Sequence, residues 1–244
     1  DDWICWPIGF GRDLRVEKND TAMVDETAHH ANSRRSRLPD VRSLRMTGDN
    51  ETLKFYDGEA EKYAEWSPPP HPYPYLEQFL AKAPAGRLLD FGCGSGWAAA
   101  RMVEAGRSVD ALDGSAELAA EAQRNYGLDV TVARFDAFAE AAKYSAVWAH
   151  FSLLHDIKAN MPANLKRLHD ALTSEGLLYL GLKAGDGERR DSLGRFYAYY
   201  EMQELSDLLA TAGFLNIDIR GRTGLAYDGG EERLWHVFAH RGAA

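Results

Sequence analysis

Three glycines at alternate positions, Gly92, Gly94 and Gly96, are the residues whose spacing most clearly points to chemistry. They follow the strand-like run RLLDF (87–91) and precede a helix-like run, so they occupy the turn at the carboxyl edge of a strand, where open α/β sheets bind ligands. Glycine adopts positive φ without strain and has no Cβ, so a nucleotide can pack against bare backbone. A dinucleotide fingerprint needs a small residue at the next position, which is Trp97 here. The turn therefore predicts a nucleotide-like cofactor and argues against NAD or FAD.

Acidic residues accompany this turn in or after three strand-like runs. Asp90 lies in the run before the glycines, Asp113 ends the run SVDALD, and Asp136 follows the run DVTVARF. A carboxylate accepts hydrogen bonds from two hydroxyl groups, so such a residue suits a ribose. The alternative is an ordinary helix-capping or surface carboxylate, which is common at strand ends.

Two histidines and two tyrosines are the candidates for the acceptor side of a site. His150 and His155 lie at and just after the end of the run SAVWAHF, and a histidine with a pKa near neutrality can take a proton from a hydroxyl, thiol or nitrogen. Tyr56 and Tyr63 belong to a helical stripe over 51–66, where they would form an aromatic lid that excludes water. The alternatives are a histidine that hydrogen-bonds only within its loop and tyrosines that only pack a helix.

Basic and aromatic residues gather in the connection after the fifth strand-like run. Arg190 and Tyr199 are the main candidates there for binding an anionic or aromatic acceptor, with Arg189, Arg195 and Tyr197 close by in sequence. The alternative is a solvated loop. The acidic and histidine residues lack the spacing of metal ligands and the two cysteines form no CxxC pair, so no metal site is predicted.

The elements that must position these residues alternate between strand-like and helix-like runs. From Arg87 onward the alternation has the βαβ rhythm of a parallel, doubly wound sheet. The last two strand-like runs, LNIDIRGR and RLWHVFAH, are joined by a turn with no helix between them, which predicts a terminal antiparallel pair. We therefore expect an α/β fold with a Rossmann-like, seven-stranded, mostly parallel sheet, a C-terminal antiparallel strand and an N-terminal helical cap.

The run Leu89–Gly96 fits the pattern DxGxGxG, and on it the chain resembles the class I S-adenosylmethionine (SAM)-dependent methyltransferases over roughly residues 55–240. The overall pattern is most similar to the small-molecule group that includes ubiquinone-biosynthesis-like and tellurite-resistance-like methyltransferases. The resemblance implies SAM as cofactor and transfer of its methyl group to a small-molecule acceptor, with Asp113 on the ribose hydroxyls and Asp136 on the adenine amino group. The cofactor-binding residues that it implies are Asp90, Gly92, Gly94, Gly96, Asp113, Asp136, Ala137 and Ala149.

The same resemblance gives the remaining candidates their roles. Tyr56 and Tyr63 would form the lid, Arg190 and Tyr199 would border the acceptor, and His155, or second His150, would assist as a base. It also divides the chain into a helical cap over residues 46–85 and a SAM-binding methyltransferase domain over residues 86–244. Residues 1–45 show no sustained period of two or 3.6 and are expected to be poorly structured, and Met46 is one candidate for the native start.

Composition restricts the partners. The formal net charge of -9 and pI near 5.4 disfavour electrostatic binding to the phosphate backbone of a nucleic acid, so nucleic acid is not expected as a partner. No apolar run approaches 18 residues, so we expect no membrane insertion and a cytoplasmic protein, either a monomer or a homodimer. Two other functions stay open: a nicotinamide-dependent oxidoreductase on a Rossmann fold, and a SAM-binding regulator without transfer activity.

Overall fold

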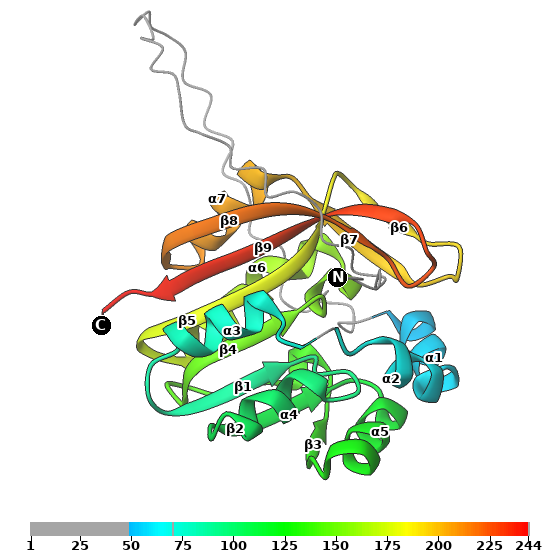
Figure 1. Cartoon of the computed structure of the whole chain (residues 1–244). Coiled ribbons are helices and arrows are strands. Elements are labelled where there is room, and N and C mark those ends of the chain that lie inside the picture. The colour runs from blue at the N-terminus through cyan, green and yellow to red at the C-terminus, as the bar shows by residue number, and fades with distance from the viewer. Residues whose placement is uncertain (1–48, 70, 244) are drawn as a thin grey trace, which may run out of the picture.

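The computed structural model describes residues 49–69 and 71–243, so the predictions for residues 1–45 and for a start at Met46 lie outside the described residues. A mixed sheet of nine strands runs through the centre of the molecule, with helices on both of its faces (Figure 1). No helix in the part of the chain that the structure describes is long and apolar enough to cross a membrane.

The parallel part of the sheet has the strand order β3-β2-β1-β4-β5, and each neighbouring pair is parallel. Its strands are β1 (Arg87–Phe91), β2 (Ser108–Asp113), β3 (Val130–Val132), β4 (Tyr144–His150) and β5 (Leu172–Ala184). The connecting helices are α4 (Trp97–Glu104), α5 (Ala116–Tyr126) and α6 (Met161–Ala171), with short 3-10 turns η2 (Phe135–Ala137), η3 (Leu153–His155) and η4 (Lys158–Asn160). The order reverses between β1 and β4, and a doubly wound sheet opens a crevice at such a reversal.

The chain ends in the expected antiparallel pair. After α7 (Met202–Thr211), β8 (Phe214–Leu225) pairs with β9 (Glu231–Arg241), and β9 lies antiparallel to β5. These strands complete the seven-stranded Rossmann-like sheet that the sequence predicts.

Two further strands come from the connection between β5 and α7. There, β6 (Glu188–Arg190) and β7 (Phe196–Tyr200) form an antiparallel hairpin, and β7 pairs with the last two residues of β5. This hairpin was not expected from the sequence, and it raises the strand number from seven to nine.

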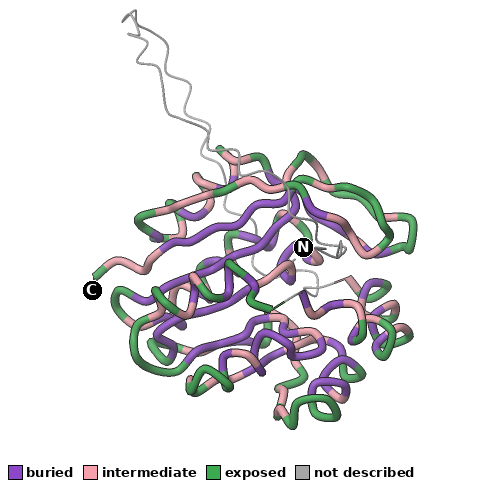
Figure 2. Tube along the Cα trace, viewed as in Figure 1, coloured by how far each residue is buried: buried purple, intermediate pink, exposed green. Residues whose placement is uncertain are grey.

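Alternating residues along the central strands build two hydrophobic cores, one on each face of the sheet. Trp148 and Tyr179 pack with α3 (Pro74–Lys82) and α4, whereas Val147 and Leu178 pack with α6 and α7. All four are fully buried, as the purple central strands of Figure 2 show. Because burial of a large apolar side chain stabilises a protein by about 1.5–3 kcal/mol, these cores hold the strand ends in fixed positions.

The helical stripe predicted over 51–66 is two helices, α1 (Asn50–Gly58) and α2 (Ala60–Trp66), so the expectation of one continuous helix was wrong. The chain leaves helical geometry at Glu59, which has φ of -116° and ψ of 15°. Gly58 precedes this break, and glycine costs about 1 kcal/mol in a helix interior. Both helices pack against α5, which places them beside the crevice of the sheet.

Candidate functional site

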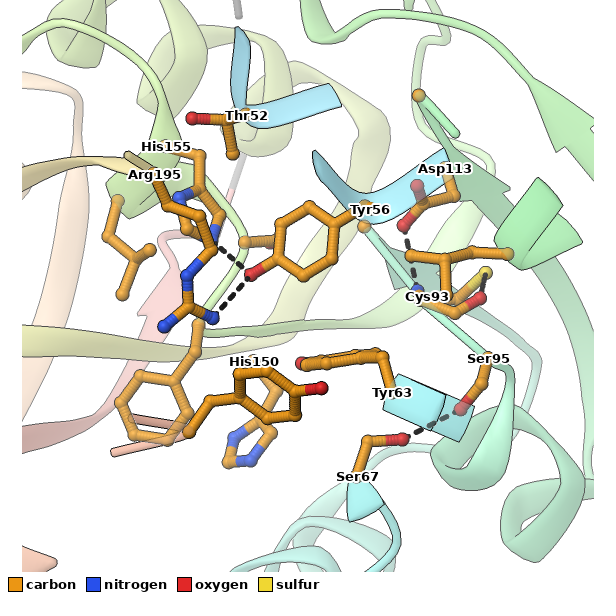
Figure 3. Close-up of a pocket in the computed structure, with 18 of the residues that line it drawn as sticks. Thr52, Tyr56, Tyr63, Ser67, Cys93, Ser95, Asp113, His150, His155 and Arg195 are labelled. Atoms are coloured by element: carbon orange, nitrogen blue, oxygen red, sulfur yellow. Dashed lines mark hydrogen bonds between the residues drawn. The ribbon is translucent and has the colours of Figure 1, made fainter. Parts of the chain in front are cut away.

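A pocket lies at the carboxyl ends of β1, β2 and β4 and beside the end of β5, and α1 and α2 cover it (Figure 3). Its lining includes Gly94 from the glycine turn, Asp113 from β2, His150 from β4 and Tyr197 from β7. Tyr227, in the turn between β8 and β9, also lines the pocket. Residues near the start of the described chain, in α1 and α2, and near its end, in the β8–β9 turn, therefore line the same pocket.

The three glycines of the turn have different physical reasons for being glycine. All three have positive φ, between 55° and 85°. A Cβ at Gly92 would lie 2.2 Å from Cβ of Ser152, and one at Gly96 would lie 2.8 Å from Cβ of Ala122, so packing excludes side chains there. A Cβ at Gly94 would meet only the Tyr63 ring, at 3.8 Å. Gly94 is therefore the glycine whose bare backbone is open to the pocket.

Asp113 holds the glycine turn in place. Its Oδ2 accepts a hydrogen bond from N–H of Gly94 at 2.7 Å, and its Oδ1 accepts one from N–H of Ser115 at 2.9 Å. Burial raises the pKa of Asp113 above its ordinary value. Each oxygen of a carboxylate can accept more than one hydrogen bond, so Asp113 can still accept from a ligand.

Asp90 is the buried acidic residue of the turn. It is 1% exposed, and its Oδ2 has no hydrogen-bond partner among the residues that the structure describes. Burial raises the pKa of Asp90 to about 8, so the carboxyl group is mostly protonated near neutral pH. A buried oxygen without a partner is costly, so a donor from a ligand would stabilise it.

Four of the cofactor-binding residues suggested by the resemblance do not line the pocket: Gly96, Asp136, Ala137 and Ala149. Asp136 and Ala137 lie in η2 with exposed side chains, and the neighbouring Phe135 lines the pocket instead. Ala149 is fully buried on the face of β4 that packs with α6 and α7. The next residue of β4, His150, does line the pocket.

Tyr56 and His155 are brought together from α1 and η3. The Tyr56 hydroxyl lies 2.9 Å from Nε2 of His155, and Nδ1 of His155 lies 2.8 Å from the carbonyl oxygen of Phe196. A carbonyl only accepts, so Nδ1 carries the proton and donates it. Burial lowers the pKa of His155 to about 3, so the ring is neutral and Nε2 accepts from the Tyr56 hydroxyl. A guanidinium N–H of Arg195 donates to the same tyrosine oxygen at 3.5 Å.

His150 belongs to a different hydrogen-bonded chain. Its Nδ1 lies 3.0 Å from the Tyr179 hydroxyl, which lies 2.7 Å from Nδ1 of His236. Burial lowers the pKa of His150 to about 3 and that of His236 well below its ordinary value. His150 therefore presents a neutral imidazole to the pocket, held from behind by Tyr179.

Aromatic side chains of α1 and α2 pack against the turn between β8 and β9. The Tyr63 ring lies 5.0 Å from that of Tyr56 and 5.5 Å from that of Tyr227, and Trp66 lies 4.9 Å from Tyr227, centroid to centroid. Both predicted lid tyrosines thus line the pocket as part of a connected set of rings. The Tyr56–Tyr63 and Trp66–Tyr227 pairs are edge-to-face, and such pairs contribute about 0.5–1.5 kcal/mol each beyond their buried area.

Arg190 and Tyr199, the candidates from the connection after β5, do not line the pocket. Arg190 forms ion pairs with Asp49 at 2.8 Å and Glu51 at 3.0 Å, so it ties the β6–β7 hairpin to the start of α1. Tyr199 is buried beside the Arg189 guanidinium, which lies 3.4 Å from its ring centroid. The nearby Arg195, in contrast, does line the pocket.

Lys183 and Glu232 are charged residues of the lining that were not predicted from the sequence. Lys183 lies near the end of β5, and Glu232 lies near the start of β9. For Lys183 the sequence did contain a signal, because it is the one charged residue in the otherwise apolar strand GLLYLGLKA (176–184). Among residues 49–69 and 71–243, no group of three or more His, Cys, Asp or Glu side chains could hold a metal ion.

Comparison with known proteins identifies the part of the chain that carries the glycine turn. Residues 88–176 match the family model described as a methyltransferase domain. An uncharacterized methyltransferase of Staphylococcus carnosus (strain TM300) is 26% identical over 140 residues, which are 57% of this chain and 68% of that protein.

Solved structures share the fold at lower identity. A 1,6-didemethyltoxoflavin-N1-methyltransferase of Burkholderia thailandensis, solved with 1,6-didemethyltoxoflavin and S-adenosylhomocysteine (SAH), has a TM-score of 0.61 at 20% identity, covering 84% of this chain and 98% of that one. A phosphoethanolamine N-methyltransferase 2 of Haemonchus contortus, solved with phosphomonomethylethanolamine and SAH, has a TM-score of 0.62 at 14% identity, covering 78% of this chain and 60% of that one. These likenesses concern the fold.

Proposed function

We propose, from the premise that the chain belongs to the class I SAM-dependent methyltransferases, that it transfers a methyl group from SAM to a small-molecule acceptor in the pocket beneath α1 and α2. One observation carries the proposal: Gly94 and Asp113 on the cofactor side share one pocket with Tyr56 and His155. The Burkholderia enzyme, which was solved with bound 1,6-didemethyltoxoflavin, is consistent with a small-molecule acceptor.

The residues of the glycine turn fit the cofactor of the family. SAM carries ribose hydroxyls, which suit the Asp113 carboxylate, and an ammonium group, which suits the unpartnered Oδ2 of Asp90. The open side of Gly94 leaves room for the ligand against the backbone. Asp136 and Ala137, which do not line the pocket, remain candidates for the adenine end, where Phe135 supplies an apolar wall.

Methyl transfer asks mainly for alignment of the acceptor and exclusion of water. SAM supplies a methyl group that its sulfonium already activates. In this proposal the α1–α2 cover keeps water out, and the Tyr56 oxygen accepts a hydrogen bond from an O–H or N–H of the acceptor, because its own proton is donated to His155. His155 is then a positioning residue that acts through Tyr56.

Calorimetric titration with SAM, SAH and NADH tests the cofactor assignment. We expect SAM and SAH to bind in the micromolar range, about -8 kcal/mol, and NADH not to bind. Asp113→Ala should abolish binding, whereas Asp110→Ala, on the same strand but outside the pocket lining, should leave it unchanged. Binding of NADH in place of SAM would support an oxidoreductase instead, and SAM binding without transfer to any acceptor pool would support a regulator.

A further inference from the structure

Around the Tyr197 ring, on the acceptor side of the pocket, lie two cations, and each has its own carboxylate. Arg195 and Lys183 both line the pocket, and so does Glu232, while Asp191 lies behind Arg195. The inference drawn from these pairs rests on the proposed function, because it concerns the acceptor of the same site.

Arg195 is neutralised within the β6–β7 hairpin. Its Nε and one terminal nitrogen donate to Oδ2 of Asp191 at 2.8 and 2.6 Å, and both side chains are buried, 2% and 8% exposed. Its guanidinium lies 5.1 Å from the ring centroids of both Phe55 and Tyr227 and 5.3 Å from that of Tyr197. The aromatic rings on this side therefore already surround a cation of the chain itself.

Lys183 is neutralised across the sheet. Its Nζ lies 2.5 Å from Oε2 of Glu232 and 3.5 Å from the ring centroid of Tyr197. The lysine side chain is 8% exposed and the glutamate 23%. Removing either partner would leave a charge without its counterion in a largely apolar environment, which costs several kcal/mol.

The two histidines of the lining add no charge, because burial keeps the pKa of both His150 and His155 at about 3. The charges of the two ion pairs around Tyr197 thus sum to zero. An anionic acceptor beside Lys183 would also lie beside Glu232, which repels it. The cost of removing the anion from water would therefore not be compensated by the lysine. A cationic acceptor would be attracted to the aromatic rings, but the Arg195 guanidinium already lies over the Tyr227 ring and would repel it.

We propose that the acceptor is an uncharged, planar aromatic molecule, and that Glu232 is a specificity-determining residue that excludes anions by keeping Lys183 paired. The rings of Tyr63, Trp66, Phe151 and Tyr227 supply apolar surface for such a molecule. Its polar atoms would meet the Tyr56 oxygen and the imidazole of His150.

Three matched probes test this proposal on the SAH-loaded protein: quinolin-6-ol, quinoline-6-carboxylate and quinolin-6-ylmethanamine, which share one ring system and differ in charge near neutral pH. Binding is measured by calorimetry after SAH binding itself has been confirmed, so a failure of the cofactor assignment is detected first. The wild type should bind quinolin-6-ol at least about tenfold more tightly than either charged probe, a difference of about 1.4 kcal/mol. Tightest binding of the carboxylate or the amine, or binding of none of the three, would overturn the proposal.

Glu232→Gln supplies the second measurement, because it frees Lys183 while keeping the size of the side chain. The variant should bind quinoline-6-carboxylate at least about tenfold more tightly than the wild type does, with little change for quinolin-6-ol. Glu231→Gln, at the exposed neighbouring position, should change neither affinity. An unchanged affinity of a folded, SAH-binding Glu232→Gln protein for the carboxylate would show that Glu232 does not select against anions.

Discussion

The Tyr56 hydroxyl donates its proton to Nε2 of His155 across 2.9 Å, and the direction of that bond is set on the opposite side of the imidazole by the carbonyl oxygen of Phe196. A contact between α1 and η3 therefore depends on β7, a third segment. Thr52 reinforces the arrangement, since its hydroxyl oxygen accepts a hydrogen bond from N–H of Phe196 at 2.8 Å. The helix α1 and the turn η3 are thus joined through one residue of the hairpin, Phe196.

Tyr56→Phe should lower methyl transfer by about tenfold or more, because it removes the oxygen that we assign to orienting the acceptor. The affinity for SAH should change by less than about threefold, since the ring and its packing are kept. Initial rates and calorimetry on the same preparation check both parts. Tyr126→Phe, at a half-exposed position on α5, is the control, and unchanged transfer by Tyr56→Phe would remove Tyr56 from the acceptor contact.

The rate of methyl transfer should show no titration of His155 between about pH 5 and pH 8. The folded-state pKa of His155 is about 3, so its neutral form persists throughout that window and is lost only as the pH falls toward 3. His155→Gln should lower turnover at every pH in the window by a similar factor, with SAM affinity nearly intact. A wild-type acid limb near pH 6.5 that disappears in His155→Gln would contradict this neutral assignment.

Gly94→Ala should abolish SAM binding while the protein stays folded. The new Cβ would meet no atom of residues 49–69 and 71–243 closer than 3.8 Å, so only the positive φ of 55° is strained there, at about 1–2 kcal/mol. The methyl group would, however, occupy the ligand side of the turn. Gly92→Ala is the matched comparison, because its Cβ would collide with Ser152 and should destabilise the fold itself. Thermal unfolding and SAM titration separate the two effects, and SAM binding retained by Gly94→Ala would argue against the assignment.

SAM binding near pH 7 should release close to one proton from Asp90. Without a ligand, the pKa of about 8 leaves this carboxyl group mostly protonated, and a neighbouring ammonium group lowers the pKa, so the proton leaves on binding. Calorimetry in two buffers with different ionisation enthalpies measures the release directly. Asp90→Asn should bind SAM more weakly and without the buffer dependence; a wild-type enthalpy that is equal in both buffers would mean that Asp90 does not face the ammonium group.

The sheet and the glycine turn were predictable because their signals are local. The strand at 87–91, the helix beginning at Trp97 and the strand at 108–113 each show their period and their boundaries within a few residues. The antiparallel ending was predictable for the same reason, since a turn between two strand-like runs leaves few other topologies.

The residues of the acceptor side depend on pairings between distant segments, which one sequence does not reveal. Lys183 and Glu232 pair across β5 and β9, and the Tyr56–His155 contact joins residues 99 positions apart. The β6–β7 hairpin escaped prediction because its first strand is the charged triplet at 188–190, which has no apolar period. Arg190 looked like an acceptor contact, yet folding brings Asp49 to it from an unrelated part of the chain.

Because of the β6–β7 hairpin, the residues of the proposed site come from two separate stretches of the sequence. Asp191, Arg195 and Tyr197 come from one uninterrupted stretch inserted between β5 and α7, whereas the glycine turn and Asp113 come from the first half of the sheet. In the proposed function, replacing that stretch would alter residues around the acceptor, while the glycine turn and Asp113 would be kept. In such a fold, exchange of the one stretch between β5 and α7 would change the acceptor, while the residues assigned to the methyl donor would be kept.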